Sequence, residues 1–161
     1  MKKPSKIKVI TAKVSKLICP IGYAAITWFG TIFTRKEDYA NLINKTDQID
    51  STLKCHETIH VRQAQNTNDS WFRFYCLYVW QWICNLPLIT VNIHAPYKFI
   101  PFEMEAYKHE REFEYPNLTD NGCAQWRVFK KMSLKEKRRL AKEYYKKWHL
   151  SFCQFLNEYL K

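Results

Sequence analysis

Glycine is scarce in this sequence, which contains three Gly and six Pro among 161 residues. This scarcity argues against a loop-dominated or low-complexity protein, because turns and flexible linkers depend on glycine. Hydrophobic residues make up 47% of the chain and aromatic residues 16%, which is enough to bury a core and excludes a disordered protein. The length is usual for one domain, and we expect a single domain over residues 1–161.

None of the six cysteines has a partner at C-x-x-C spacing, and their intervals follow no pattern. A zinc ribbon or a small disulfide scaffold is therefore not expected. We interpret the cysteines as buried free thiols in a reducing compartment and expect a cytoplasmic protein. A cleaved secretory signal is not expected, because Pro20 and Gly22 interrupt the first apolar stretch. The cysteines are Cys19, Cys55, Cys76, Cys84, Cys123 and Cys153.

The sequence has no long uninterrupted hydrophobic run that predicts a membrane-spanning helix. The nearest candidate is the aromatic stretch 71–85 followed by the apolar segment 86–93, and polar residues and a proline interrupt both. We expect a buried core helix over 71–85, packed beneath the helix that carries the candidate active site. Membrane association through residues 71–96 is the alternative.

Acidic residues are few relative to basic ones: 15 Asp and Glu stand against 26 Lys and Arg, which gives a formal net charge of +11. The basic residues concentrate in segments 1–16 and 127–147. This charge permits attraction to a polyanion or to an anionic membrane surface through a basic C-terminal helix, and a solvated helix face is the alternative. No recognisable nucleic-acid-binding module accompanies it.

The order of the expected elements predicts an α+β fold, with a small sheet ahead of an active-site helix. Residues 6–10 and 24–34 have the composition of strands, and the second segment contains one strand or two that meet near Gly30. Breaker residues at 66–70 and 116–122 separate the helices that follow. We expect helices over about 51–65, 71–85 and 101–115.

The C-terminal part predicts one long amphipathic helix. Ser133 and Glu136 have the spacing of a capping box, and apolar residues recur at three- and four-residue intervals as far as Tyr159. We therefore expect a metal-site core over about 20–115 and a basic helical extension over about 123–161.

Chemistry is carried by the H-E-x-x-H motif at His56-Glu57-Thr58-Ile59-His60. On a helix, residues four apart lie on the same face, so His56 and His60 can bind one metal ion, and zinc accepts imidazole nitrogens. Glu57 lies about 100° around the helix from His56. From there its carboxylate can act as the base that takes a proton from a water at the metal.

A zinc hydrolase needs a third protein ligand and an open fourth position. Acidic residues and a histidine in the predicted helix 101–115 offer that ligand, although most members of such a run lie on a solvated face. The candidates are Glu103, Glu105, His109, Glu110, Glu112 and Glu114.

H-E-x-x-H followed by E-x-x-A, here Glu103-Met104-Glu105-Ala106, resembles the gluzincin metallopeptidases. The stretches AITWFGTIF, CHETIHVRQ and IPFEMEAY also look like a group of small predicted peptidases from bacterial and phage genomes. The resemblance covers about residues 20–110. It implies a minimal zincin-like α+β domain that binds Zn²⁺ through His56, His60 and Glu103, with Glu57 as base.

The sequence departs from the larger gluzincin families after Ala106, where Tyr107 stands in place of an aspartate that orients a ligand histidine. This departure leaves Glu105 as an alternative third ligand, although the motif register favours Glu103. Tyr107 or His109 can donate a hydrogen bond to an oxyanion, and we include both among the candidate catalytic residues.

Two functions are consistent with these features. The first is a zinc-dependent metallopeptidase that hydrolyses a peptide or amide bond in a peptide or protein substrate. The alternative is a non-enzymatic, basic interaction or structural protein, viral or envelope-associated, that retains a zincin fold.

Overall fold

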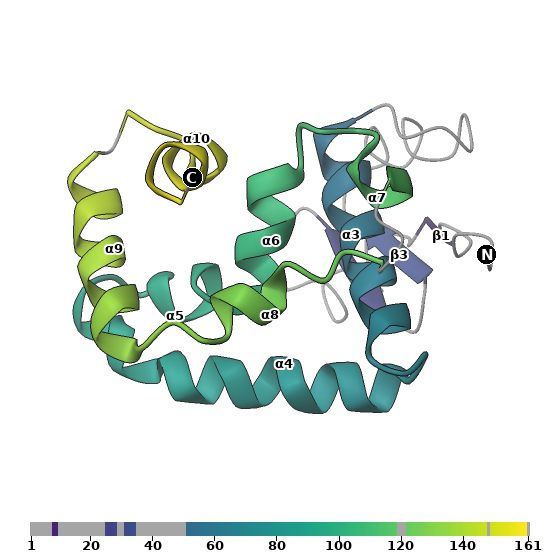
Figure 1. Ribbon diagram of the computed structural model, residues 1–161, viewed down its shortest axis with the longest axis horizontal. Helices are drawn as coiled ribbons and strands as arrows, with labels where there is room; N and C mark the ends of the chain where they lie inside the picture. The colour runs from purple at the N-terminus through teal and green to yellow at the C-terminus, as the bar shows by residue number, and fades with distance from the viewer. Residues whose placement is uncertain are drawn as a thin grey trace.

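The computed structural model describes residues 51–118, 122–147 and 149–160, together with the backbone of residues 8–9, 25–28 and 31–34. Helices form nearly all of it, and from residue 51 onward its described part contains no strand (Figure 1). The main helices are α3 (Thr52–Asn66), α4 (Trp71–Asn85), α6 (Pro101–His109), α9 (Leu134–Lys146) and α10 (Phe152–Tyr159). Shorter ones are the 3₁₀ helix η1 (Leu86–Thr90), α5 (Ala95–Lys98), α7 (Tyr115–Leu118) and α8 (Trp126–Phe129).

The predicted α+β fold class is wrong, because the molecule is helical. Strand geometry is confined to three short segments, β1 (Lys8–Val9), β2 (Ala25–Trp28) and β3 (Thr31–Thr34), in the order β1-β3-β2. β3 pairs antiparallel with β2 and parallel with β1. The hydrophobic clusters among residues 51–160 of the described structure are built from helices and their connections.

The predictions for α3 and α4 are confirmed at both ends. Ser51 caps α3 by accepting a hydrogen bond from the backbone N–H of Lys54 at 3.2 Å, and Ser70 caps α4 in the same way. Between the two helices, Asn68 and Asp69 adopt φ angles of 62° and 55°. Asn and Asp tolerate this left-handed conformation better than most residues, so the polar cluster at 66–70 ends α3.

Helix α6 lies at the centre of the described structure, between α3, α8 and α10 (Figure 1). It begins at Pro101 as predicted, but it ends at His109 and does not reach Tyr115. The chain turns there, with the N–H of Glu112 donating to the carbonyl of His109 at 2.9 Å. This turn brings the ring of Tyr115 onto that of His109, with 3.7 Å between the centroids, a contact that a continued helix would not allow.

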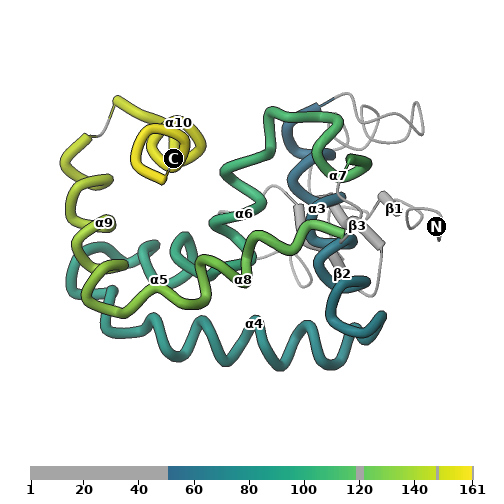
Figure 2. The backbone as a smooth tube through the Cα atoms, viewed as in Figure 1, coloured from purple at the N-terminus to yellow at the C-terminus, as the bar shows by residue number. Residues whose placement is uncertain are grey.

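The prediction of a single long C-terminal helix is also wrong. Helix α9 begins at the predicted capping box, ends at Lys146 and is followed by a turn into α10 (Figure 2). A second capping box, formed by Ser151 and Gln154, starts α10. The break lets α10 fold back against α6, where Asn157 donates to the carbonyl of Lys108 at 3.0 Å.

Helix α4 is not the buried core helix that its aromatic composition predicted. Its only buried side chains are Phe74, Gln81 and Asn85, whereas large apolar residues such as Phe72 and Trp80 face solvent. Asn85 links α4 to its neighbours: its amide donates to the carbonyl of Pro96, and its side-chain oxygen accepts from Lys137 of α9. None of the helices in the described ranges is long and apolar enough to cross a membrane.

Lys137 gives α9 a pH-dependent contribution to stability. Burial lowers the pKa of its ammonium group to about 8, whereas the unfolded chain holds its proton up to about 10.5. Between these values the unfolded state binds more protons, so stability rises with pH. We expect wild type to gain about 2–3 kcal/mol relative to Lys137→Met between pH 8 and 10.5 in urea unfolding. Parallel pH profiles for the two proteins would contradict this assignment.

Candidate metal centre

The candidate site begins with one face of α3. His56, His60 and Gln63 are spaced by four and three residues, so their side chains lie along the same side of the helix. All three side chains are buried, which means that their polar atoms need partners inside the protein.

Helix α6 presents a matching face. Glu103, Tyr107 and Glu110 are also spaced by four and three residues, and they face α3. The two helices run antiparallel, because His56 lies beside Glu110 whereas Gln63 lies beside the start of α6 at Phe102.

Three ligand-type atoms converge between these faces. The Nε2 atoms of His56 and His60 are 3.2 Å apart, and the Glu103 carboxylate oxygens lie 3.4 Å from the first and 3.2 Å from the second. All three side chains are buried and offer their ligand atoms within 4.8 Å of one another. A tetrahedral zinc site with bonds of about 2.0–2.1 Å has ligand-to-ligand separations of about 3.3 Å. The two nitrogens match this separation, and each carboxylate oxygen matches it toward one of the histidines, so the cluster comes close to the geometry of such an ion.

Gln63 fixes the orientation of His60. Its amide nitrogen donates to the carbonyl of Phe102 at 3.0 Å and to the carboxylate of Glu105 at 2.8 Å. Its amide oxygen therefore faces Nδ1 of His60, at 2.8 Å, and accepts a hydrogen bond from the N–H group there. In the neutral imidazole this arrangement leaves the Nε2 lone pair directed into the cluster, as a metal ligand requires.

Glu110 plays the corresponding part for His56. Its carboxylate lies 3.2 Å from Nδ1 of that histidine, so Nε2 is again the atom that faces the cluster. A carboxylate in this position orients a ligand histidine and raises its basicity. Glu110, about one helical turn beyond Tyr107, therefore occupies a position from which a carboxylate can orient His56.

The cluster is electrostatically coupled. Burial alone would lower the pKa of His56, but hydrogen bonds to Glu103 and Glu110 and the charge of Glu103 raise it to about 10. Burial likewise opposes the charged form of His60, and the charge of Glu103 raises its pKa. Burial would raise the pKa of Glu103, but the two histidines hold it well below its usual range. The two Nε2 atoms and the Glu103 carboxylate lie so close together that either protons or one bound cation must offset their mutual repulsion.

Two tyrosines lie against the cluster, one beside Glu103 and one beside His56. Tyr78 of α4 donates to the carboxylate at 2.7 Å. The ring of Tyr107 meets that of His56 edge-on, with 4.6 Å between centroids. Burial, reinforced by the charges of Glu103 and Glu110, raises the pKa of Tyr107, so its hydroxyl keeps its proton and remains a donor.

Glu57 follows His56 on α3, so its side chain is turned about 100° from that of His56 around the helix axis. Its side chain is buried, and its charge raises the pKa of His56, His60 and Tyr107. The carboxylate is thus within electrostatic reach of the cluster without being one of the three converging groups, as the role of a base requires.

The remaining candidates on α6 lie on another face. The carboxylate of Glu105 accepts four hydrogen bonds, from the Gln63 amide, the Tyr115 hydroxyl and the backbone N–H groups of Gln125 and Trp126. His109 is four residues further along the same face, and its ring nitrogens pair with Glu112 and Gln125. Both residues hold α3, α6 and the segment before α8 together, and neither is brought to the cluster.

Three residues around the cluster were not predicted in these positions from the sequence: Gln63 and Glu110, which orient the histidines, and Tyr78, which donates to Glu103. Helical spacing contained the signal for the first two, because each lies seven residues from a ligand on its own helix. Tyr78 comes from a third helix, and no local pattern in the sequence predicts its contact.

The chain matches no protein-family model, no curated protein and no solved structure. The resemblance to gluzincins therefore stays a prediction that rests on the motif residues.

The network around Glu105 yields a stability prediction. In Glu105→Gln, the new NH₂ group would face donors where the carboxylate oxygen now accepts. We expect a loss of about 2–4 kcal/mol in the free energy of unfolding, measured with urea. The exposed Glu114→Gln is the matched control and should change stability by less than about 0.5 kcal/mol. Equal effects of the two substitutions would show that the four hydrogen bonds do not stabilise the fold.

Proposed function

We propose that this chain is a zinc-dependent hydrolase of peptide or amide bonds. The observation that carries the proposal is the convergence of His56 Nε2, His60 Nε2 and the Glu103 carboxylate, which offer ligand atoms within 4.8 Å of one another, with Nδ1 of both histidines already paired. Two histidines and one glutamate are a ligand set typical of catalytic zinc sites, in which the fourth position takes water or substrate.

The donor set also favours zinc over harder cations. Calcium and magnesium prefer six or more oxygen ligands, and this cluster offers two nitrogens and one carboxylate. When bound, zinc supplies a Lewis acid that lowers the pKa of a water molecule to about 7 and polarises a carbonyl.

The other residues would act on the substrate around that centre. Glu57 accepts the proton of the attacking water and passes it to the leaving amine. Tyr107, which keeps its proton, donates to the oxygen that becomes negative as the carbonyl is attacked. The tyrosines and Phe74, whose ring centroid lies 6.4 Å from that of His60, restrict water access to the cluster.

Metal content tests the site first. We expect about one zinc per chain in purified wild type by elemental mass spectrometry, because the three ligand atoms are already in place. His56→Ala should lose the zinc, whereas His94→Ala removes an exposed histidine outside the cluster and should retain it. Absence of zinc from wild type expressed with added zinc would overturn the proposal.

Catalysis is tested separately with Glu57→Gln. This variant should bind zinc like wild type and lose at least about 100-fold of the hydrolysis rate on a fluorogenic peptide library, because the base is gone while the ligands remain. If zinc-loaded wild type cleaves no member of the library at a rate above that of Glu57→Gln, the non-enzymatic alternative is favoured.

The orienting role of Glu110 predicts a change in zinc affinity. Glu110→Ala should weaken zinc binding by about 10–100-fold in a chelator competition, because His56 loses the acceptor at Nδ1. Glu112→Ala is the matched control: it removes a nearby carboxylate that pairs with His109, and zinc affinity should stay within about threefold of wild type. An unchanged affinity in Glu110→Ala would mean that helix packing alone orients His56.

A further inference from the structure

Helix α4 carries large apolar side chains on both of its sides. Its inner side packs Phe74, Leu77 and Tyr78 into the core beside buried Gln81 and Asn85, and its outer side also carries large apolar groups. Phe72 is 78% exposed and Trp80 61% exposed. Neither Gln81 side-chain atom has a hydrogen-bond partner among the described residues. This arrangement costs stability in water, so the outer side calls for a functional explanation.

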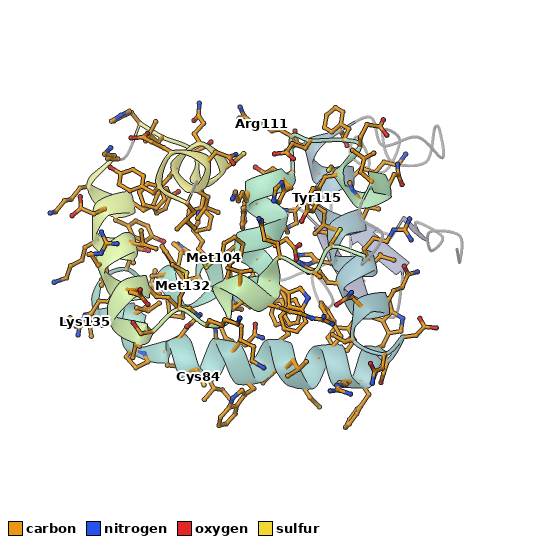
Figure 3. All side chains as sticks on the ribbon, viewed as in Figure 1. Cys84, Met104, Arg111, Tyr115, Met132 and Lys135 are labelled. Atoms are coloured by element: carbon orange, nitrogen blue, oxygen red, sulfur yellow. The ribbon has the colours of Figure 1, made fainter. Side chains whose placement is uncertain are left out.

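The exposed residues form one continuous stripe. Phe72, Cys76, Val79, Trp80 and Ile83 follow one another at intervals of four, three, one and three residues, which places them on one side of the helix. We call these five residues the α4 face. Exposed Ile89 and Ile93 extend it beyond the helix. Figure 3 shows side chains projecting from the side of α4 that points away from the other helices.

Basic residues outnumber acidic ones near the α4 face, where exposed Asp69 precedes α4 and exposed Glu136 lies in the first turn of α9. Between Asp69 and Glu103 the sequence contains no acidic residue. The basic helix α9 starts beside the end of this surface, where Arg138 donates to the hydroxyl of Thr90 at 2.8 Å. Lys135 and Lys142 are exposed on α9, and Figure 3 shows Lys135 at the end of α9 that adjoins α4.

We propose that the α4 face binds the surface of an anionic lipid bilayer, with α4 lying in the plane of the interface. Exposed Trp, Phe and Ile side chains enter the boundary between headgroups and acyl chains, and the neighbouring lysines and arginines attract anionic headgroups. A helix of 15 residues is too short to span the hydrocarbon core but long enough to lie on it. A nucleic acid would match the charge but not the apolar stripe, whereas a bilayer surface matches both.

Vesicle cosedimentation of the full chain tests the proposal. Wild type should bind vesicles of phosphatidylcholine with phosphatidylserine more tightly than vesicles of phosphatidylcholine alone. The double variant Phe72→Ser/Trp80→Ser should weaken binding to the anionic vesicles by about tenfold or more, because two large apolar groups no longer enter the interface. Lys135→Glu/Lys142→Glu should remove the preference for anionic vesicles.

The matched control is Leu118→Ser/Val128→Ser, which removes two apolar side chains that are 74% and 62% exposed on other helices. It should leave vesicle binding unchanged. The proposal is overturned if wild type does not sediment with anionic vesicles. It is overturned equally if Leu118→Ser/Val128→Ser weakens vesicle binding as much as Phe72→Ser/Trp80→Ser does. It is also overturned if the α4 face instead pairs two copies of the chain, seen as a dimer that Phe72→Ser/Trp80→Ser dissociates without changing vesicle binding.

Discussion

The buried side chain of Gln63 connects three parts of the structure. Its amide oxygen accepts a hydrogen bond from His60 on the same helix, and its amide nitrogen donates to the backbone carbonyl of Phe102 and to Glu105 on α6. Glu105 in turn receives the backbone N–H groups that open α8. Each of these polar groups is buried, so each bond that is lost leaves a partner without compensation. The distance between α3 and α6, and with it the separation of the ligand atoms, depends on this chain of hydrogen bonds.

Helix α6 carries two sets of polar residues with different tasks. One face, with Glu103, Tyr107 and Glu110, meets the histidines; the other, with Glu105 and His109, joins the helix to the rest of the protein. The two glutamates nearest the helix start differ by two residues, which on a helix is about 200° of rotation. One of them therefore faces the histidines and the other faces structural donors, although their local sequences are similar.

Much of the local structure follows from short-range chemistry. Ser51 and Pro101 mark helix starts that the structure confirms, because a cap or a proline acts on its own first turn. Helix ends were predicted less well. Helix α6 ends early because the chain turns to stack Tyr115 on His109. The predicted C-terminal helix is divided because the cap at Ser151 starts a new helix within a continuing apolar pattern. The predicted fold class was wrong because helices form nearly all of the described chain and only three short segments are strands.

Those parts of the candidate site that depend on helical spacing could be predicted from the sequence. The pair His56 and His60 lies on one face by geometry alone, and the register of Glu103 follows from its position in the second motif. The outward orientation of Phe72, Trp80 and Trp82 on α4 was not predictable, because apolar content does not say which side of a helix is covered. Only the position of α4 at the edge of the helical body decides that.

The two antiparallel faces also have a consequence for how such a centre can be transferred. The three converging ligands and both residues that orient the imidazoles lie within residues 56–63 and 103–110, about two turns on each helix. These two eight-residue windows form a portable unit. An antiparallel helix pair with the same spacing, a buried acceptor for the Gln63 amide and a donor in the place of Tyr78 would reproduce this arrangement of side chains on an unrelated helical scaffold.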